Sequence, residues 1–210
     1  SNTGGGISPL VGIYMDEVPL SFTAQLQANL QPIDIQRLEV LRGPQGTLYG
    51  QGSTGGTIRY VTNNPSFDGF NGKIGASASS MTGGDTSSEV KATLNIPVID
   101  DRLAFRLATS YKDRGGWIDQ RDIDKKDVND TQASYIRLKA LWQASDDLTV
   151  NAMVLRSRSD SGSINTANIR GADGDTYYRV TAVNDLPLAN SDYTTDNDVY
   201  NVTVDYDLGF

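Results

Sequence analysis

The sequence predicts an all-β protein in which about six amphipathic strands form a portion of a transmembrane antiparallel β-barrel, after part of a small mixed α+β domain. Three observations support this prediction. After residue 65, segments of roughly ten residues alternate apolar and polar side chains. The connections between these segments differ in length, and the pattern itself changes near Asn63-Asn64-Pro65. We therefore expect two domains, at residues 1–65 and 66–210.

Composition excludes several classes of function. The 210 residues carry a net charge of -8, which disfavours a nucleic-acid partner because phosphates require clustered Lys and Arg. Cysteine and histidine are absent, so disulfides, thiolate metal sites and imidazole catalysis are unavailable. No apolar run approaches the roughly 20 residues of a membrane helix. We expect neither a cofactor nor an enzyme.

The first 65 residues combine short apolar groups with many glycines and prolines, which is typical of a small domain of strands and turns. One short helix is predicted around Phe22 to Leu30. The run Gly50-Gln51-Gly52-Ser53-Thr54-Gly55 matches the dinucleotide fingerprint G-x-G-x-x-G. That fingerprint must open a helix, whereas β-forming residues Thr57 to Thr62 follow here, so we reject a nucleotide site.

The later segments each separate an apolar face from a polar face. In one of them Val90, Ala92 and Leu94 alternate with Glu89, Lys91 and Thr93. In the other segments the apolar positions are Ile74, Ala76 and Ala78; Leu103, Phe105 and Leu107; Ile136, Leu138, Ala140 and Trp142; Leu148, Val150, Ala152 and Val154; and Tyr200, Val202, Val204, Tyr206 and Leu208. Periodicity alone fits a soluble β-sandwich as well as a barrel.

The lengths of the connections favour the barrel. Asp100-Asp101 and Ser145-Asp146-Asp147 are tight turns, whereas the intervening links run from about Asp113 to Thr131 and from about Ser157 to Asn197. Short turns on the periplasmic rim and long loops on the extracellular rim are typical of outer-membrane barrels. The longest link is acidic, and its carboxylates indicate either solvation or a weak calcium candidate at Asp173 and Asp175.

One ordered set of motifs resembles a known family. Leu38-Glu39-Val40-Leu41-Arg42-Gly43-Pro44 is followed by Gly46, by Leu48-Tyr49-Gly50, and then by Gly55-Gly56-Thr57-Ile58. This order resembles the C-terminal half of the plug domain of TonB-dependent outer-membrane receptors. Gly12 to Leu20 upstream and Asp113 to Asp119 downstream are also similar to such receptors.

The resemblance implies an active importer of the Gram-negative outer membrane, with a barrel of about 22 strands around a plug. Its ligand would be scarce and small, such as an iron–siderophore complex, cobalamin or a glycan. Its partners would be outer-membrane lipid and TonB, which contacts receptors through a short N-terminal box that is not recognisable here. We expect an internal fragment that extends from mid-plug to the sixth strand.

The resemblance also suggests roles for individual residues. Arg42 is expected to form ion pairs with acidic residues of the inner barrel wall on later strands, although an ordinary surface arginine is the simpler alternative. Trp117, Tyr177 and Tyr178 are candidates to stack on a siderophore or sugar ring. Two other classes remain open: a secreted or periplasmic β-sandwich binding module, and an enzyme that relies on carboxylates alone.

Overall fold

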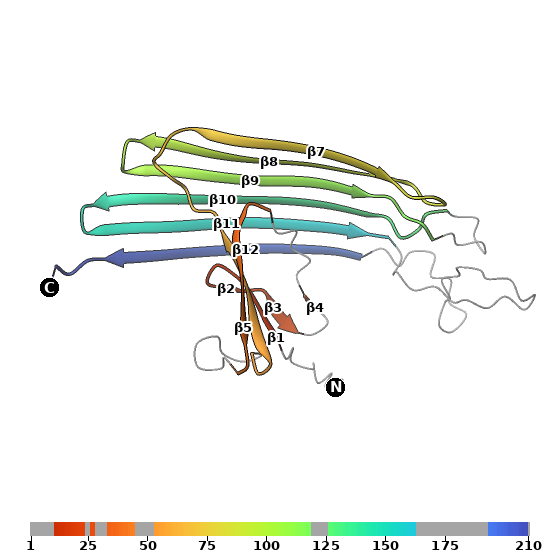
Figure 1. The fold of residues 1–210 in the computed structure, drawn as a ribbon, viewed down its shortest axis with the longest axis horizontal. Coiled ribbons are helices and arrows are strands. Elements are labelled where there is room, and N and C mark those ends of the chain that lie inside the picture. The colour runs from red at the N-terminus through yellow and green to blue at the C-terminus, as the bar shows by residue number, and fades with distance from the viewer. Residues whose placement is uncertain are drawn as a thin grey trace, which may run out of the picture.

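The computed structural model describes residues 11–23, 26–27, 33–44, 53–118, 126–162 and 193–209. Every regular element within these ranges is a β-strand, and the strands form one four-stranded, one six-stranded and one two-stranded sheet (Figure 1). The predicted all-β class is therefore confirmed. Within the described ranges no helix is long and apolar enough to cross a membrane.

The four-stranded sheet, called the small sheet below, comes from the N-terminal part of the chain. It contains β1 (Val11–Met15), β2 (Val18–Pro19), β5 (Ile35–Arg42) and β6 (Gly56–Thr62) in the order β2-β1-β6-β5. β1 and β6 are parallel, and the other two pairs are antiparallel. Because β6 follows Gly55 directly as a strand, the structure agrees with the rejection of a nucleotide site.

The predicted helix around Phe22 to Leu30 is wrong where the structure describes this segment. β3 (Ser21–Thr23) pairs with β4 (Leu26–Gln27) in an antiparallel two-stranded sheet. Phe22 and Thr23 favour a helix only weakly, and pairing between the two short strands overrides the stronger helix preference of Leu26 and Gln27. The remaining residues of the predicted helix lie outside the described ranges.

The six-stranded sheet, called the large sheet below, is an antiparallel meander. Its strands are β7 (Asn71–Ser80), β8 (Thr86–Ile99), β9 (Leu103–Arg114), β10 (Thr131–Ser145), β11 (Leu148–Ser161) and β12 (Tyr193–Tyr206). They are arranged in sequence order, from β7 at one edge to β12 at the other (Figure 1). The six predicted strands are confirmed, whereas the division into domains at residues 65 and 66 stays a prediction.

The strands extend farther than the hydrophobic pattern indicated. Ser161 is opposite Tyr193 in the ladder, so residues 157–161 and 193–197 are strand rather than the ends of a loop. This part of the ladder is polar on both faces: Arg158 donates to Asp160, and Thr194 donates to Asp160. A strand that lacks an apolar face produces no apolar alternation, so periodicity cannot detect it.

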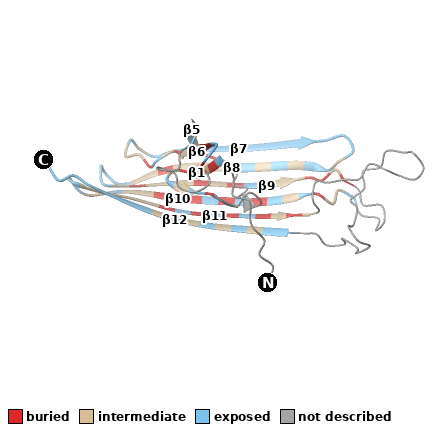
Figure 2. Ribbon diagram, turned by 90° about the horizontal axis from the view of Figure 1, so that it is seen from below, coloured by how far each residue is buried: buried red, intermediate tan, exposed pale blue. Residues whose placement is uncertain are grey.

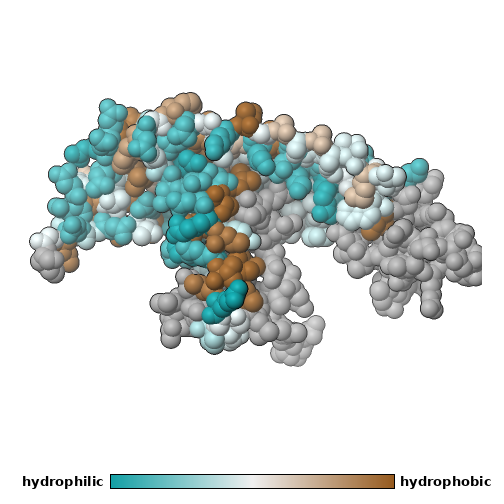
Figure 3. Space-filling model, viewed as in Figure 1, coloured by the Kyte–Doolittle hydropathy of each residue, from teal (hydrophilic) through white to brown (hydrophobic). Residues whose placement is uncertain are grey.

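Burial in the large sheet is inverted relative to a soluble protein. Along β10 the apolar Ile136 and Leu138 are exposed, whereas the alternate Arg137 and Lys139 are buried. Figure 2 shows the buried residues gathered along the central strands of the large sheet, where the small sheet lies, and long exposed stretches on the edge strands β7 and β12. Hydrophilic and hydrophobic side chains are mixed on the small sheet, which projects from the large sheet in Figure 3.

Candidate functional site

The candidate site is the contact between the small sheet and the polar face of the large sheet. An apolar cluster lies at its centre, where buried residues from the N-terminal part meet buried residues from three strands of the large sheet. These residues are Met15, Leu20, Ile33, Ala108, Tyr135 and Leu155. The cluster is small, so burial of apolar area alone attaches the two sheets weakly and polar contacts carry much of the attachment.

Asp34 forms the strongest of these polar contacts. Arg106 on β9 donates to both carboxylate oxygens of Asp34, from Nε and Nη2, at 2.6 Å each. Arg137 on β10 donates from Nη2 to the backbone carbonyl of Asp34 and to its Oδ2, both at 3.3 Å. Asn63 donates to Oδ1 at 2.8 Å. One buried carboxylate of the small domain thus holds two arginines of the large sheet.

Asp16 forms a second contact, with Lys139, which is two residues from Arg137 on β10. It lies in the turn between β1 and β2, and its carboxylate accepts hydrogen bonds from the backbone N and the Oγ1 of Thr62 at 2.8 and 2.7 Å. Lys139 Nζ donates to Asp16 Oδ2 at 3.2 Å, to Thr62 Oγ1 at 3.0 Å and to Asn64 Oδ1 at 2.6 Å. All three donor positions of the buried ammonium group are therefore occupied.

Both aspartates adopt the left-handed backbone conformation, with φ values of 51° at Asp16 and 56° at Asp34. Aspartate and asparagine tolerate this conformation better than most residues with a side chain. At these two turns the chain needs a residue that accepts positive φ and also carries a negative charge. Asparagine or glycine would meet only the first requirement, which gives a physical reason for aspartate at both positions.

The register of the large sheet explains why two carboxylates are needed. Lys139 on β10 is directly opposite Arg106 on β9, and Arg137 is two residues away on the same face. Like charges directly opposite each other destabilise a sheet. Asp16 and Asp34 lie over these three cations and compensate most of their charge. We call these five residues, Asp16, Asp34, Arg106, Arg137 and Lys139, the charge cluster.

The environment of Asp34 also affects its titration. Burial by itself raises the pKa of this carboxyl, but the hydrogen bonds from Arg106 and Asn63 and the charges of Arg106 and Arg137 outweigh it, so the pKa lies below its usual value of 3.8. Asp34 is therefore ionised at neutral pH, as the cluster requires.

The connection between the two sheets is attached to the same polar face. Asn95 on β8 is completely buried. Its Oδ1 accepts from the backbone N of Ser66 at 2.8 Å, and its Nδ2 donates to the carbonyls of Ser66 and Gly69 at 2.9 Å each. One amide side chain thereby satisfies three backbone groups of the connection, which keeps the large sheet in a defined position after β6.

At the rim that carries the long connections, Trp117 is half-buried. The guanidinium carbon of Arg114 lies 5.2 Å from the centre of its ring. Asn129 Oδ1 accepts from the backbone N of Trp117 at 2.7 Å and of Ile118 at 2.9 Å, which holds this segment in place. Arg114 therefore contacts the ring of Trp117. The predicted role of Trp117 in ligand binding stays a prediction.

The other predicted site residues divide into described and undescribed ones. Arg42 is exposed at the end of β5, and within the described ranges it forms no ion pair. Gly43 has a φ of 83° and Gly56 a φ of 145°; a Cβ on Gly56 would lie 2.6 Å from the carbonyl oxygen of Leu41, so glycine is required there. Pro44 is exposed and Gly55 precedes β6. The candidates Gly46, Tyr49, Gly50, Asp173, Asp175, Tyr177 and Tyr178 lie outside the described residues.

The charge cluster was missed by sequence reasoning. The alternation along β9 and β10 assigned Arg106, Arg137 and Lys139 to the polar face. It predicted that this face is exposed to solvent, whereas the structure buries it. A signal was present: Arg137 and Lys139 occupy alternating positions of one strand, Arg106 is on the polar face of the strand before it, and these polar faces carry no acidic residue next to them, so anions from elsewhere are required. No group of three or more metal-ligating side chains occurs within the described ranges.

Comparison with known proteins agrees with this arrangement of a small sheet on the polar face of amphipathic strands. Residues 3–57 match the family model described as the TonB-dependent receptor plug domain. The pesticin receptor of Yersinia pestis is 32% identical over 207 residues, which cover 93% of this chain and 29% of the receptor. The metal-pseudopaline receptor CntO of Pseudomonas aeruginosa is 31% identical over 145 residues, covering 66% of this chain and 18% of that receptor.

The fold is similar to that of solved receptor structures. The ferric yersiniabactin uptake receptor FyuA of Yersinia pestis superposes with a TM-score of 0.76 at 24% identity, covering 96% of this chain and 30% of that one. FpvAI in complex with pyocin S2 superposes with a TM-score of 0.68 at 16% identity, covering 94% and 25%. Together these findings define a plugged outer-membrane β-barrel protein. The chain belongs to the TonB-dependent receptor family.

The chain spans about 29% of the length of the curated relatives that it matches over most of its own length. Its relatives are named as receptors and not as enzymes, in agreement with the prediction. Membership of the family places the chain in the outer membrane of a Gram-negative bacterium. The small sheet lies largely within the residues that match the plug, and the large sheet corresponds to strands of the barrel in the solved receptor structures.

Proposed function

We propose that this chain is part of an active importer of negatively charged metal–siderophore complexes, energised by TonB. The observation that carries the proposal is the attachment of the small sheet, through the charge cluster, to the polar face of the large sheet. In the proposed barrel this cationic surface is the inner face. A plug held by ion pairs can be held firmly at rest and still be released in part when force is applied. The relatives support the ligand class, because one is named for a metal-pseudopaline complex and another for ferric yersiniabactin.

The inner face also supports an anionic ligand. Besides the cations of the charge cluster, the same face of the ladder carries Lys73, Lys91, Lys112 and Arg114, and Glu89 is an acidic residue among them. An excess of positive charge on a confined surface raises the local concentration of anions. Ferric complexes of carboxylate or phenolate chelators are commonly anionic, whereas cobalamin and neutral glycans gain nothing from this charge.

Roles for three groups follow from the proposal. The long connections at one rim capture the ligand, and Trp117, Tyr177 and Tyr178 contribute ring surface for it. Arg42, which is exposed at the end of β5, pairs with acidic residues on the inner wall of the barrel in the full-length receptor. TonB supplies the force that displaces the plug, and outer-membrane lipid surrounds the apolar face of the large sheet.

The test is uptake by cells. A full-length receptor carrying this sequence is expressed in a Gram-negative strain that lacks its own ferric-chelate receptors. Radioactive iron is supplied as the yersiniabactin, pyoverdine or enterobactin complex. We expect uptake of at least one complex, its loss in cells without TonB, and reduced uptake by Arg42→Glu at equal receptor abundance. Uptake of cobalamin or a glycan, with none of the ferric complexes, would contradict the proposed ligand class.

A further inference from the structure

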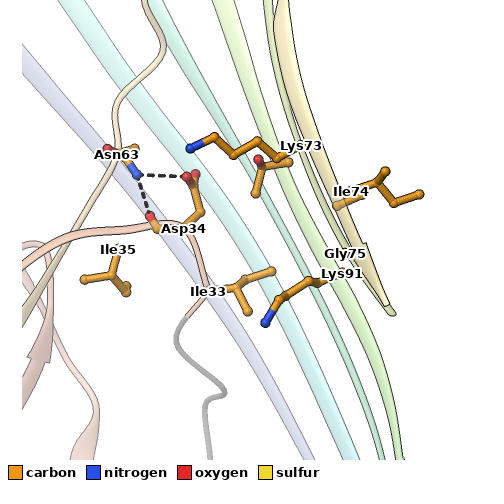
Figure 4. Close-up of a pocket in the computed structure, with 10 residues that line it drawn as sticks. Ile33, Asp34, Ile35, Asn63, Lys73, Ile74, Gly75 and Lys91 are labelled. Atoms are coloured by element: carbon orange, nitrogen blue, oxygen red, sulfur yellow. Dashed lines mark hydrogen bonds between the residues drawn. The ribbon is translucent and has the colours of Figure 1, made fainter. Parts of the chain in front are cut away.

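A cavity of about 320 Å³ lies between the N-terminal part of the chain and the first two strands of the large sheet. Ile33, Asp34 and Asn63 line one side, and Lys73, Lys91 and Thr93 line the other. Figure 4 shows the side chains of Lys73 and Lys91 extending from their strands toward the opposite wall, while Ile74 points away. This cavity is separate from the long connections at the rim.

The strand register places the cavity halfway along the length of the strands of the large sheet. Lys73 is opposite Thr93 on β8, which is opposite Ala108 near the middle of β9. The same row continues to Arg137 on β10. An occupant would therefore lie about midway between the rim with the tight turns and the rim with the long connections, beside the small sheet rather than above it.

The charge around this cavity is positive. Asp34 contributes one carboxylate, but Arg106 and Arg137 already bind it. Lys73 forms no ion pair with any residue that the structure describes. Lys91 has one distant partner: its Nζ lies 3.9 Å from Glu89, and its side chain is 55% exposed. Two ammonium groups thus face the cavity with little compensation.

We infer that this cavity binds an anionic group, a carboxylate or phenolate of the metal chelate, between Lys73 and Lys91. The inference rests on the proposed function, which supplies the anionic ligand. The volume is at the lower end of the roughly 300–1,000 Å³ of ligand pockets, so it admits one arm of a chelate rather than the whole complex. Asn63 and Thr93 add polar groups, and Ile33 adds apolar surface for the carbon frame of that arm.

Gly75 offers a way to close the cavity without changing its charge. Its Cβ position would lie 3.5 Å from both Cγ and Cε of Lys91, which is ordinary van der Waals distance. Alanine therefore fits at this position with no strain, whereas the larger side chain of leucine would project into the space beside Lys91. Gly75→Leu is thus a steric test, and Gly75→Ala is its matched control.

The experiment uses the full-length receptor and whichever ferric complex the wild-type receptor imports. Binding to energy-depleted cells and uptake by energised cells are measured separately, with receptor abundance in the outer membrane determined for each variant. We expect K73E/K91E to bind the complex within about twofold of wild type but to import it at least about tenfold more slowly, a change of about 1.4 kcal/mol in the barrier. Gly75→Leu should slow import in the same way, whereas K73R/K91R and Gly75→Ala should not.

Arg102→Glu serves as the control for charge, because Arg102 is an exposed residue at the tight turn after β8. The inference is overturned if K73E/K91E or Gly75→Leu imports at the wild-type rate, or if Arg102→Glu is slowed as much. If K73E/K91E does not accumulate in the membrane, Gly75→Leu decides alone. A wild-type receptor that imports none of the complexes would instead refute the proposed function. The inference about the cavity would then fail as well, because its anionic ligand follows from that function.

Discussion

The two faces of β10 differ in which side chains they bury: one face exposes its apolar residues, and the other buries its charged ones. On one face Ile136 and Leu138 are 49% and 43% exposed, while on the other Arg137 and Lys139 are 1% and 8% exposed. In water this arrangement would be unfavourable on both sides, because apolar surface is hydrated and charge is buried. Each face therefore needs a different partner: two aspartates compensate the charge of the inner face, and we expect lipid to cover the outer face.

We expect the largest loss of stability from a substitution at Asp34, which compensates the charge of the inner face. Asp34→Ala leaves Arg106 and the fully buried Arg137 without their carboxylate. Breaking a buried ion pair from one side costs about 3–5 kcal/mol. We expect a loss of this size in the denaturant-induced unfolding free energy of the full-length receptor, together with faster proteolysis of the small sheet.

The control for this prediction is Asp68→Ala. Asp68 lies in the connection between the sheets and accepts a hydrogen bond from Ser66, with an exposed side chain. Its removal leaves no buried charge, so it should change the unfolding free energy very little. A loss below about 1 kcal/mol for Asp34→Ala would mean that Arg106 and Arg137 find other partners, and the charge cluster would not attach the plug.

The outer face is tested by Leu138→Arg. Leu138 lies in an apolar row with Leu107 on β9 and Val154 on β11. Arginine at the middle of the lipid-facing band of an outer-membrane barrel costs about 2–4 kcal/mol. The unfolding free energy should fall by this amount when the full-length receptor is measured in lipid bilayers.

Gln132→Arg is the matched control on the same strand and face. Gln132 is exposed near the rim and is opposite Asp160 on β11, so an arginine there remains near water and next to a carboxylate. The two variants thus compare the same residue at two depths. Equal effects at both positions would show that the outer face of β10 does not lie in lipid.

The smallest effect is expected from acidification over the physiological range. Because the pKa of Asp34 in the folded receptor lies below its usual value of 3.8, its contribution to stability is fully present above that value. It is lost as the pH falls through the lower, folded-state pKa. The difference in unfolding free energy between wild type and Asp34→Asn should therefore stay constant from about pH 8 to pH 5 and shrink only below about pH 4. A difference that already shrinks near pH 6 would contradict this assignment of the pKa.

Much of the fold could be predicted because each barrel strand carries its own signal. The alternation of Val90, Ala92 and Leu94 with polar residues predicts a strand and its apolar face without knowledge of its neighbours. The same reasoning failed at Phe22, where pairing of two short strands decided the structure, and at Ser157 to Ser161, where both faces of the strand are polar.

The candidate site could be predicted only in part, for a different reason. Arg42 and the glycines around it are recognised because they belong to one continuous motif. Asp34 and Arg137 are 103 positions apart, and nothing near either residue indicates the other. A contact of this kind follows from the register of two strands and from the position of the small sheet on them.

By itself, the sequence determined which residues form the amphipathic strands, where the tight turns fall, and to which family the chain belongs. These properties depend on local periodicity and on short motifs, which a linear pattern contains in full. Tertiary structure alone decided that the polar face is buried, that Arg106 and Lys139 are opposite each other, and that Asp16 and Asp34 compensate them. The physical reason is that electrostatic energy depends on distances in space, and these arise only when the two sheets meet.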